Sequence, residues 1–423
     1  MNMFYTGLGV ARSLGERGVP VLGLSSRRGI FGNFTRYART IVCPDSREEP
    51  EALLAFLLEL GRKLEKRAVI FPTRDDDLVF LDRFRTELQP YFSLAAADSV
   101  PLRACLDKWE TASWARRAGV PAPQCWLLKQ RQDIERVAQE ASYPCVLKPL
   151  SAHHWRRGEN WRLVGARKAI AAGSEKELRE QYNAIARADE RALVQEMIPG
   201  GDENLLIAAC YLDRQSRLVA GFNVRKLVQV PEGFGTGCIV ESVNLPELFE
   251  PAERLLRAMS FTGVAEVEFK WDARDNRYKL IEVNPRPWDQ HRLGQACGVD
   301  LIYAAYCDHA GLPAPHFGQA APGRKWIAED TFVTTALRML WRRDRRLSSL
   351  FRQARGKRTY AIWDWRDPLP LMAHVAGELI PGLLGAGIRR LGAACWRAVW
   401  PPVRQKEGGL AYEGNIQNRK NIN

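Results

Sequence analysis

The segment that most constrains the fold is Gly263–Arg286, in which two strands of alternating polarity are joined by a short turn. Side chains alternate between the two faces of a strand, so Glu266 and Glu268 share one face of the first strand. By the same rule, Glu282 and Asn284 share one face of the second strand. A hairpin would bring these carboxylates together, which is unfavourable unless a positive charge lies between them. Carboxylate and amide oxygens suit magnesium, especially where phosphate oxygens complete the shell, and a solvated acidic hairpin is the alternative interpretation.

The first hundred residues predict a different kind of sheet. Val19–Leu24 and Ala68–Pro72 have the composition of buried strands, and Pro50–Lys66 has the period of an amphipathic helix. Strands that alternate with helices are typical of a parallel sheet with helices on both faces. Thr6–Val10 has the form of a Gly-rich turn, which normally follows a strand. Because only six residues precede Gly7, that first strand is either very short or incomplete.

Beyond residue 100 the pattern changes in style. A helix is expected from Asp107 to Gly119, where a glycine followed by prolines gives a conventional stop signal. A second helix is expected around Glu175–Ile185. Residues 204–284 contain four strand-like segments that favour antiparallel pairing. We therefore expect an α/β domain with a parallel sheet, followed by an α+β region.

The charge of the chain is distributed unevenly. The 423 residues include 62 Lys+Arg and 49 Asp+Glu, a formal net charge of +13 that by itself suggests a nucleic-acid partner. Residues 331–423, however, contain 17 basic and 6 acidic side chains and carry +11 of this charge. The preceding residues are nearly neutral, so we expect no nucleic-acid partner. A hydrophobic content of 46% excludes a disordered chain.

Cysteine usage and the late apolar stretch indicate the compartment. The 9 cysteines are scattered and form no C-x-x-C pair, which suits a reducing cytosol, and no signal-peptide pattern is visible. Leu369–Ile388 is interrupted by prolines and charged residues, so we do not predict a transmembrane helix. We expect a cytoplasmic protein in which residues 331–423 form a separate appendage, either solvated or packed on itself. Peripheral contact of this segment with an anionic membrane is the alternative, because its arginines and tryptophans suit an anionic membrane surface better than a nucleic-acid groove.

Three further features suggest anion or nucleotide binding. Lys108 and Lys148 could point at an anion, the latter from the end of an apolar strand. Ala192–Glu203 runs from an apolar strand into a Pro-Gly-Gly bend that presents acidic side chains. Lys226 precedes the glycine-rich loop Gly233–Gly237, whose backbone amides could bind phosphate. Taken singly, solvated lysines, an ordinary turn and a flexible loop explain these features equally well.

The order of these features resembles the ATP-grasp superfamily. It is most similar to the group of ATP-dependent carboxylate–amine ligases that includes D-aspartate ligase. The segments that carry the resemblance are DKWETASWARRAGVPAP, VLKPL, VQEMIPGGDE and EVEFKWDARDNRYKLIEVNPRPW. The resemblance covers residues 1–330, and the Glu-x-Asn-Pro-Arg segment is its most specific part.

The resemblance implies a role for each candidate residue and a division into domains. For the nucleotide, it implies that Lys108 and Lys148 contact ATP phosphates, that Asp202 or Glu203 holds ribose, and that adenine is held by the backbone at Gln195, Glu196, Met197 and Ile198. For the metal, it implies that two Mg²⁺ ions, or Mn²⁺ as an alternative, are bound by Glu268, Glu282 and Asn284. The implied catalytic residues are Arg286 and Lys226, which steady the transferred phosphoryl group. The implied domains are a pre-ATP-grasp α/β domain over 1–106, a lid subdomain over 107–198, a subdomain with the metal site over 199–330, and a basic C-terminal extension over 331–423.

One segment departs from the superfamily pattern. Many members carry a Gly-rich lid loop after the second lysine, whereas Ser151–Gly158 is bulky and basic here. This leaves open whether lid amides or side chains such as His154 contact the γ-phosphate. His153 and His154 are not expected to form a metal pair, because adjacent side chains on a strand face opposite ways.

The resemblance also implies a reaction. A small-molecule carboxylate attacks the γ-phosphate of ATP to give an acyl phosphate and ADP, and an amine then displaces phosphate to form an amide. Such chemistry needs alignment and charge neutralisation more than covalent help from the protein. The alternatives are a thiol or hydroxyl nucleophile on the same fold, or a nucleotide-dependent membrane or scaffold protein. A dehydrogenase is disfavoured, because Gly7 and Gly9 lack the third glycine of the dinucleotide motif.

Overall fold

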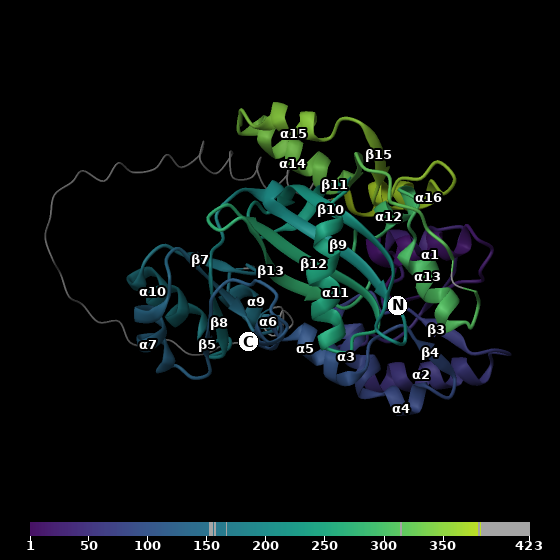
Figure 1. Cartoon of the computed structure of the whole chain (residues 1–423). Coiled ribbons are helices and arrows are strands. Elements are labelled where there is room, and N and C mark those ends of the chain that lie inside the picture. Colours follow the sequence, from purple (N-terminus) through teal and green to yellow (C-terminus); the bar gives the residue numbers. More distant parts are fainter. Residues whose placement is uncertain (152–154, 156–157, 166, 314, 380, 382–423) are drawn as a thin grey trace, which may run out of the picture. The chain divides into compact units, whose positions relative to one another are not determined.

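The computed structural model describes residues 1–151, 155, 158–165, 167–313, 315–379 and 381 (Figure 1). Residues Met1–His374 belong to one unit, and Val375 begins a second unit. Within the second unit the described residues form a short π-helical turn, η4 (Val375–Leu379). In the part of the chain that is described, no helix is long and apolar enough to cross a membrane.

A seven-stranded sheet, in the order β13-β12-β9-β10-β11-β14-β15, forms the centre of the first unit (Figure 1). Its strands are β9 (Leu205–Leu212), β10 (Leu218–Val230), β11 (Thr236–Val243), β12 (Gly263–Asp272), β13 (Arg277–Asn284), β14 (Arg324–Ile327) and β15 (Lys357–Tyr360). All neighbours pair antiparallel except β14 and β15, which confirms the antiparallel strands expected in residues 204–284. β9 is buried along its whole length, and its sequence LLIAACYL is continuously apolar because both faces of this central strand are covered.

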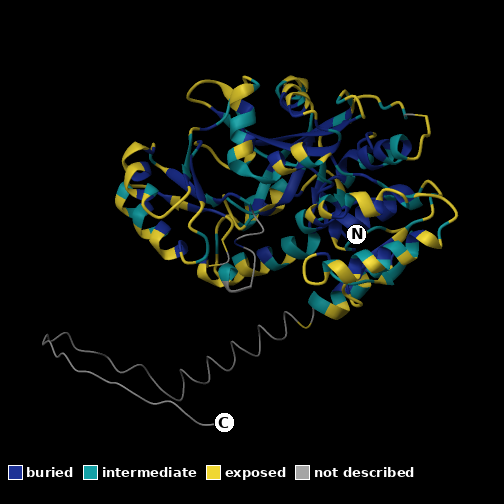
Figure 2. Cartoon of the chain, turned by 90° about the horizontal axis from the view of Figure 1, so that it is seen from below, coloured by how far each residue is buried: buried dark blue, intermediate teal, exposed yellow. Residues whose placement is uncertain are grey.

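The two faces of this sheet contribute to two separate cores. Ile207 and Ala209 belong to one core, and Leu206 and Ala208 belong to the other, as the alternation of a strand requires. The first core includes side chains of α1 (Tyr5–Gly15), α12 (Arg292–Ala296) and α13 (Leu301–His309). The second includes side chains of α5 (Ser99–Leu106), α6 (Lys108–Arg117) and α11 (Phe249–Ala258). Figure 2 shows the buried strands between helices that are exposed only on their outer sides.

Parallel strands occur near the N-terminus, as predicted, but in two small sheets instead of one. β1 (Leu22–Ser25) pairs with β2 (Arg39–Val42), and β3 (Ala68–Ile70) pairs with β4 (Phe92–Leu94). The other elements of this region are η1 (Phe31–Phe34), α2 (Pro50–Arg62), α3 (Asp75–Arg83) and α4 (Arg85–Leu88).

The predicted Gly-rich turn at Thr6–Val10 is wrong, because these residues lie inside α1. Their glycines serve close packing. A Cβ atom on Gly7 would lie 1.9 Å from the carbonyl oxygen of Asn2, and a Cβ atom on Gly9 would lie 2.7 Å from the ring of His291. The glycines are therefore explained by helix contacts and not by a turn after a strand.

A four-stranded sheet, in the order β5-β8-β6-β7, lies between residues 125 and 196. Its strands are β5 (Cys125–Leu128), β6 (Cys145–Pro149), β7 (Ile170–Ala172) and β8 (Ala192–Glu196), and its helices are α7 (Asp133–Glu140), α9 (Gly158–Leu163) and α10 (Glu175–Ile185). The predicted helix over Glu175–Ile185 is confirmed, with Ser174 as its N-cap. The two short turns η2 (Asp202–Asn204) and η3 (Pro246–Leu248) complete the elements before β14.

The expectation that the chain after residue 330 is a separate appendage is wrong as far as residue 374. This segment adds β15, α14 (Glu329–Trp341), α15 (Leu347–Gln353) and α16 (Leu369–His374) to the first unit. Arg12 Nε donates to Asp367 Oδ2 at 2.9 Å, and both side chains are almost completely buried. Asp367 also accepts hydrogen bonds from Thr35 Oγ1 at 2.6 Å and Arg36 N at 2.9 Å. This carboxylate therefore ties the segment to the N-terminal region through partners far away in sequence.

We predict that Asp367→Ala lowers the free energy of unfolding by about 3–5 kcal/mol, because it leaves the buried Arg12 guanidinium without its carboxylate partner. Urea denaturation of the full chain measures the loss. Glu59→Ala is the control, because it removes an exposed ion pair with Lys63 and should cost at most about 1 kcal/mol. Equal losses for the two variants would contradict the importance of the buried pair.

Candidate functional site

The carboxylates of β12 and β13 meet as the sequence predicts. Glu268 lies opposite Glu282 in the strand register, and Glu266 lies opposite Asn284. Asn284 Nδ2 donates to Glu266 Oε2 at 2.9 Å and to Glu282 Oε1 at 3.3 Å. From β10, Lys226 Nζ donates to Glu268 Oε2. Glu266 and Glu268 are only 6% and 5% exposed, so these contacts form inside the protein and not on a solvated hairpin.

Lysines supply the positive charge that such a cluster requires. Burial alone raises the pKa of Glu282, but Lys108, Lys226, Lys148 and Lys168 more than offset this effect and hold the pKa well below its usual value. Burial raises the pKa of Glu266 to about 8, even though Lys226 opposes the change. The pKa of Lys226 is raised, because its nearby carboxylates outweigh its burial. The cluster therefore combines buried acids and buried ammonium groups at close range.

The donor set fits magnesium only if the nucleotide contributes ligands. Among the described residues there is no group of three or more His, Cys, Asp or Glu side chains that could hold a metal ion. Glu268, Glu282 and Asn284 offer two carboxylates and one amide oxygen. Magnesium is commonly bound by one or two carboxylates together with substrate phosphates and waters, and this set matches that pattern.

The two predicted phosphate-binding lysines belong to neighbouring elements. Lys108 begins α6, where the Asp107 side chain accepts hydrogen bonds from Trp109 N at 2.8 Å and Glu110 N at 3.1 Å. Lys148 lies on β6, and its Nζ donates to Gln195 Oε1 on β8 at 2.6 Å. Burial lowers the pKa of Lys148, although Glu282 opposes the change. Both lysines thus contribute charge to the buried acids from outside the seven-stranded sheet.

The segment predicted to hold adenine spans the end of β8, with Gln195 and Glu196 inside the strand and Met197 and Ile198 after it. Glu196 N donates to the carbonyl oxygen of Gln124 at 2.9 Å, and Met197 N donates to that of Pro144 at 3.1 Å. These two bonds fix Glu196 and Met197 against their neighbours, and Gln195 is held within the sheet, where it pairs with Cys125 on β5 and Val146 on β6.

The two carboxylates predicted to hold ribose have different surroundings. Asp202 accepts hydrogen bonds from Gln229 N and Gln229 Nε2, both at 2.8 Å. Glu203 has no side-chain hydrogen bond or ion pair with a described residue. The bend before them requires glycine, because Gly200 has φ +101° and a Cβ atom there would lie 2.0 Å from Asn204 Nδ2. Glu203 is therefore the stronger ribose candidate.

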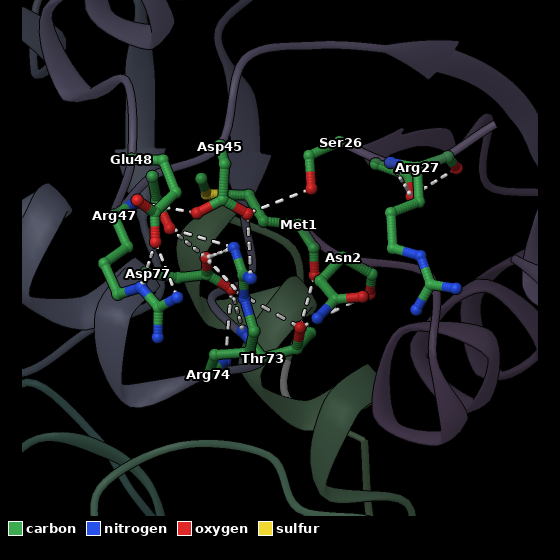
Figure 3. A network of polar contacts seen from close by, with 12 residues as sticks. Met1, Asn2, Ser26, Arg27, Asp45, Arg47, Glu48, Thr73, Arg74 and Asp77 are labelled. Carbon is green, nitrogen blue, oxygen red and sulfur yellow. Dashed lines mark hydrogen bonds and ion pairs between the residues drawn. The ribbon is translucent and has the colours of Figure 1, made fainter. Parts of the chain in front are cut away.

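Arg286 connects the hairpin to a cluster that sequence reasoning missed. Arg286 Nε donates to Asp75 Oδ1 at 2.6 Å. Arg74, the residue before Asp75, forms ion pairs with Asp77 at 2.9 Å and with Asp45 at 3.0 Å (Figure 3). The signal in the sequence is the run Arg74–Asp77, which begins shortly after the end of β3 at Ile70, since the carboxyl ends of parallel strands are common ligand positions.

All thirteen candidate residues line one cavity of about 1090 Å³. They are Lys108, Lys148, Gln195, Glu196, Met197, Ile198, Asp202, Glu203, Lys226, Glu268, Glu282, Asn284 and Arg286. The loop Gly233–Gly237 also lines it, and Lys168 Nζ donates to Thr236 Oγ1 at 2.9 Å. His153 and His154 of the expected lid loop lie outside the described residues.

Comparisons with known proteins agree with this geometry. Residues 239–311 match the family described as carbamoyl-phosphate synthase L chain, ATP binding domain. The chain is 22% identical over 269 residues to D-aspartate ligase of Enterococcus faecium, an alignment that spans 60% of this chain and 62% of the relative.

Two solved structures are similar in fold. The biotin carboxylase of Campylobacter jejuni, solved as a β,γ-ATP complex, has a TM-score of 0.59 with 18% identity, and 74% of this chain and 71% of that chain are covered. The L-amino acid ligase of Bacillus licheniformis has a TM-score of 0.56 with 15% identity, and 73% of this chain and 72% of that chain are covered.

The fold is that of the solved ATP-grasp ligases, and residues 239–311 match an ATP-binding domain model, so the chain is similar to ATP-grasp proteins in fold and in this segment. Its sequence is similar to that of D-aspartate ligase, as the motifs predict, over about three-fifths of either chain.

Proposed function

We propose that the chain is an ATP-dependent ligase that activates a carboxylate as an acyl phosphate and joins it to an amine, releasing ADP and phosphate. The observation that carries the proposal is one cavity that combines the acidic hairpin, the lysines around Glu282, and Arg286. Phosphoryl transfer depends on positioning and on neutralising the charge of the phosphates, and this set of groups can do both.

Each group has a proposed task. Lys108 and Lys148 bind ATP phosphates, the chain from Gln195 to Ile198 binds adenine, and Glu203, or Asp202 in its place, binds ribose. Glu268, Glu282 and Asn284 hold two magnesium ions, with Mn²⁺ as an alternative. The bound metal neutralises phosphate charge. Lys226 and Arg286 hold the transferred phosphoryl group and the acyl phosphate. Arg286 is positioned for this task by Asp75.

The same site is compatible with two alternative functions. A thiol or hydroxyl nucleophile would use the same first step, because activation of the carboxylate does not depend on the second substrate. A nucleotide-dependent membrane or scaffold protein would bind ATP without acid-dependent turnover. The similarity of the chain to D-aspartate ligase favours the amine.

We predict that Glu282→Gln lowers acid-dependent ADP formation on the order of 100-fold or more, because it removes a negatively charged ligand from the cavity without changing the size of the side chain. A coupled ADP assay with Mg²⁺ measures the loss. Glu241→Gln on β11 is the matched control, because Glu241 lies on the same sheet but outside the cavity lining. Turnover retained by Glu282→Gln would rule out the metal assignment.

A panel of carboxylic acids tests the reaction type. We predict that ADP release requires an acid together with an amine, and that hydroxylamine used as the amine gives a hydroxamate by attacking the acyl phosphate. Mass spectrometry of the products identifies the new bond. Turnover with thiols or alcohols and none with amines would favour the first alternative. ATP binding without turnover across the panel would favour the second.

We also propose a cytoplasmic enzyme with peripheral contact to anionic membranes through residues 331–423. Support among the described residues is a stripe on α14 at helical spacing, in which Leu337 and Leu340 are 44% and 62% exposed. We predict that the full chain sediments with phosphatidylglycerol vesicles and not with phosphatidylcholine vesicles. Leu337→Glu with Leu340→Glu should weaken this binding roughly tenfold. Val100→Glu, at an exposed apolar position on α5, is the control, and equal binding by both variants would argue against α14.

A further inference from the structure

One wall of the cavity is built by a segment that carries none of the superfamily motifs. Thr335, Arg338 and Met339 of α14, and Arg342 directly after it, line the cavity. Their spacing of three, four and seven residues places them on one face of the helix. The superfamily motifs lie within residues 1–330, so this wall is an addition to the site that they form.

The position of α14 is fixed by buried polar contacts and by packing. The Glu329 side chain accepts hydrogen bonds from Ala361 N at 3.0 Å and Ile362 N at 2.9 Å. Asp330 accepts a hydrogen bond from Tyr5 Oη and pairs with His374 Nε2 at 3.1 Å. Phe332, Ala336 and Met339 pack on the apolar cluster formed by Cys238, Ile239, Ile327, Leu350 and Ala354. The helix therefore presents its cavity face from a rigid base.

Arg338 and Arg342 are the cations of this face. Neither guanidinium makes a hydrogen bond or ion pair with a described residue. In contrast, Arg346 pairs with Asp344 at 2.9 Å and with Glu232 at 2.6 Å. Two like charges one turn apart on a helix repel each other, and a bound anion would relieve that repulsion. Planar guanidinium groups match carboxylates and phosphates well.

These arginines lie away from the carboxylate hairpin. α14 packs against β11, and the sheet order separates β11 from β12 by the two strands β9 and β10. With strands about 4.8 Å apart, β11 lies roughly 14 Å from the strand that carries Glu268. The cavity volume of about 1090 Å³ is slightly above the ~300–1,000 Å³ typical of a small-molecule site. There is thus room for a substrate that extends beyond the reacting carboxylate.

We propose that Arg338 and Arg342 form a second anion subsite, which binds a remote carboxylate or phosphate of an extended acid substrate. The inference rests on the proposed ligase function and adds the substrate class. It makes the two arginines specificity-determining residues, because they recognise a group distant from the bond that forms.

The test compares straight-chain α,ω-dicarboxylates of increasing length with monocarboxylates of equal carbon number. A third series, ω-phosphonocarboxylates of the same lengths, shows whether the subsite prefers a phosphate-like group or a carboxylate. KM for the acid is measured by ADP release from the full chain. The longer dianions should have a KM roughly 10-fold to 100-fold lower than their matched monoacids. Arg338→Ala with Arg342→Ala should remove this advantage and leave KM for ATP unchanged. Arg345→Ala with Arg352→Ala is the matched control, because these exposed arginines do not line the cavity.

Binding of the same acids, followed by thermal shift in the presence of ATP analogue and magnesium, gives a readout without turnover. If no acid supports ADP release but the dianions still stabilise wild type and not the double variant, the ligase proposal fails and the subsite stands. An unchanged dianion advantage in the double variant would overturn the subsite. A rise in KM for ATP alone would also overturn it, because the arginines would then serve the nucleotide.

Discussion

Repulsion among the buried carboxylates of β12 and β13 is the constraint on which the site depends. Glu266, Glu268 and Glu282 share one face of the sheet. Glu266 and Glu268 are buried and Glu282 is half-buried, so little water is left to screen their charges. The compensating lysines come from different elements: Lys226 from β10, Lys148 from β6 of the smaller sheet, and Lys108 from the start of α6. Because these lysines and the acids that they offset lie on different elements, the charges meet only when the two sheets and α6 are brought together. The same arrangement creates a cavity suited to a polyanion with its metal.

Local rules explain what the sequence predicted well. Strand alternation placed Glu268 with Glu266 on one face, and this holds because the period of a strand depends on its own residues. The helix over Glu175–Ile185 is similarly set by its Ser174 cap and amphipathic pattern. The segment Thr6–Val10 was misjudged because glycine has two common roles, in turns and in close packing. The contact that decides between them joins Gly9 to His291, which is distant in the sequence.

Non-local contacts also account for the other departures. Arg12 and Asp367 are 355 positions apart, and neither stands in a local pattern that identifies its partner. Asp75 is 211 positions from Arg286, so its place beside the candidate site could only be suspected from the end of β3. The thirteen candidate residues could be gathered from the sequence because they follow a known order of motifs. The wall formed by α14 could not, because its residues belong to no such motif and are defined by the space that they face.

The basic charge of the chain takes on a different meaning once α14 is placed. Counted along the sequence, the arginines after residue 330 form one basic segment that is separate from a nearly neutral body. In the fold, α14 meets three environments around its axis: Ala336 packs inward, Arg338 is exposed where it lines the cavity, and Leu340 is exposed outside the cavity lining. A helix turns about 100° per residue, so neighbouring arginines in the sequence can serve different surfaces. The position of a charge along the chain therefore does not separate charges that act on a substrate from charges that face solvent or a membrane. The helix face on which each arginine lies makes that distinction.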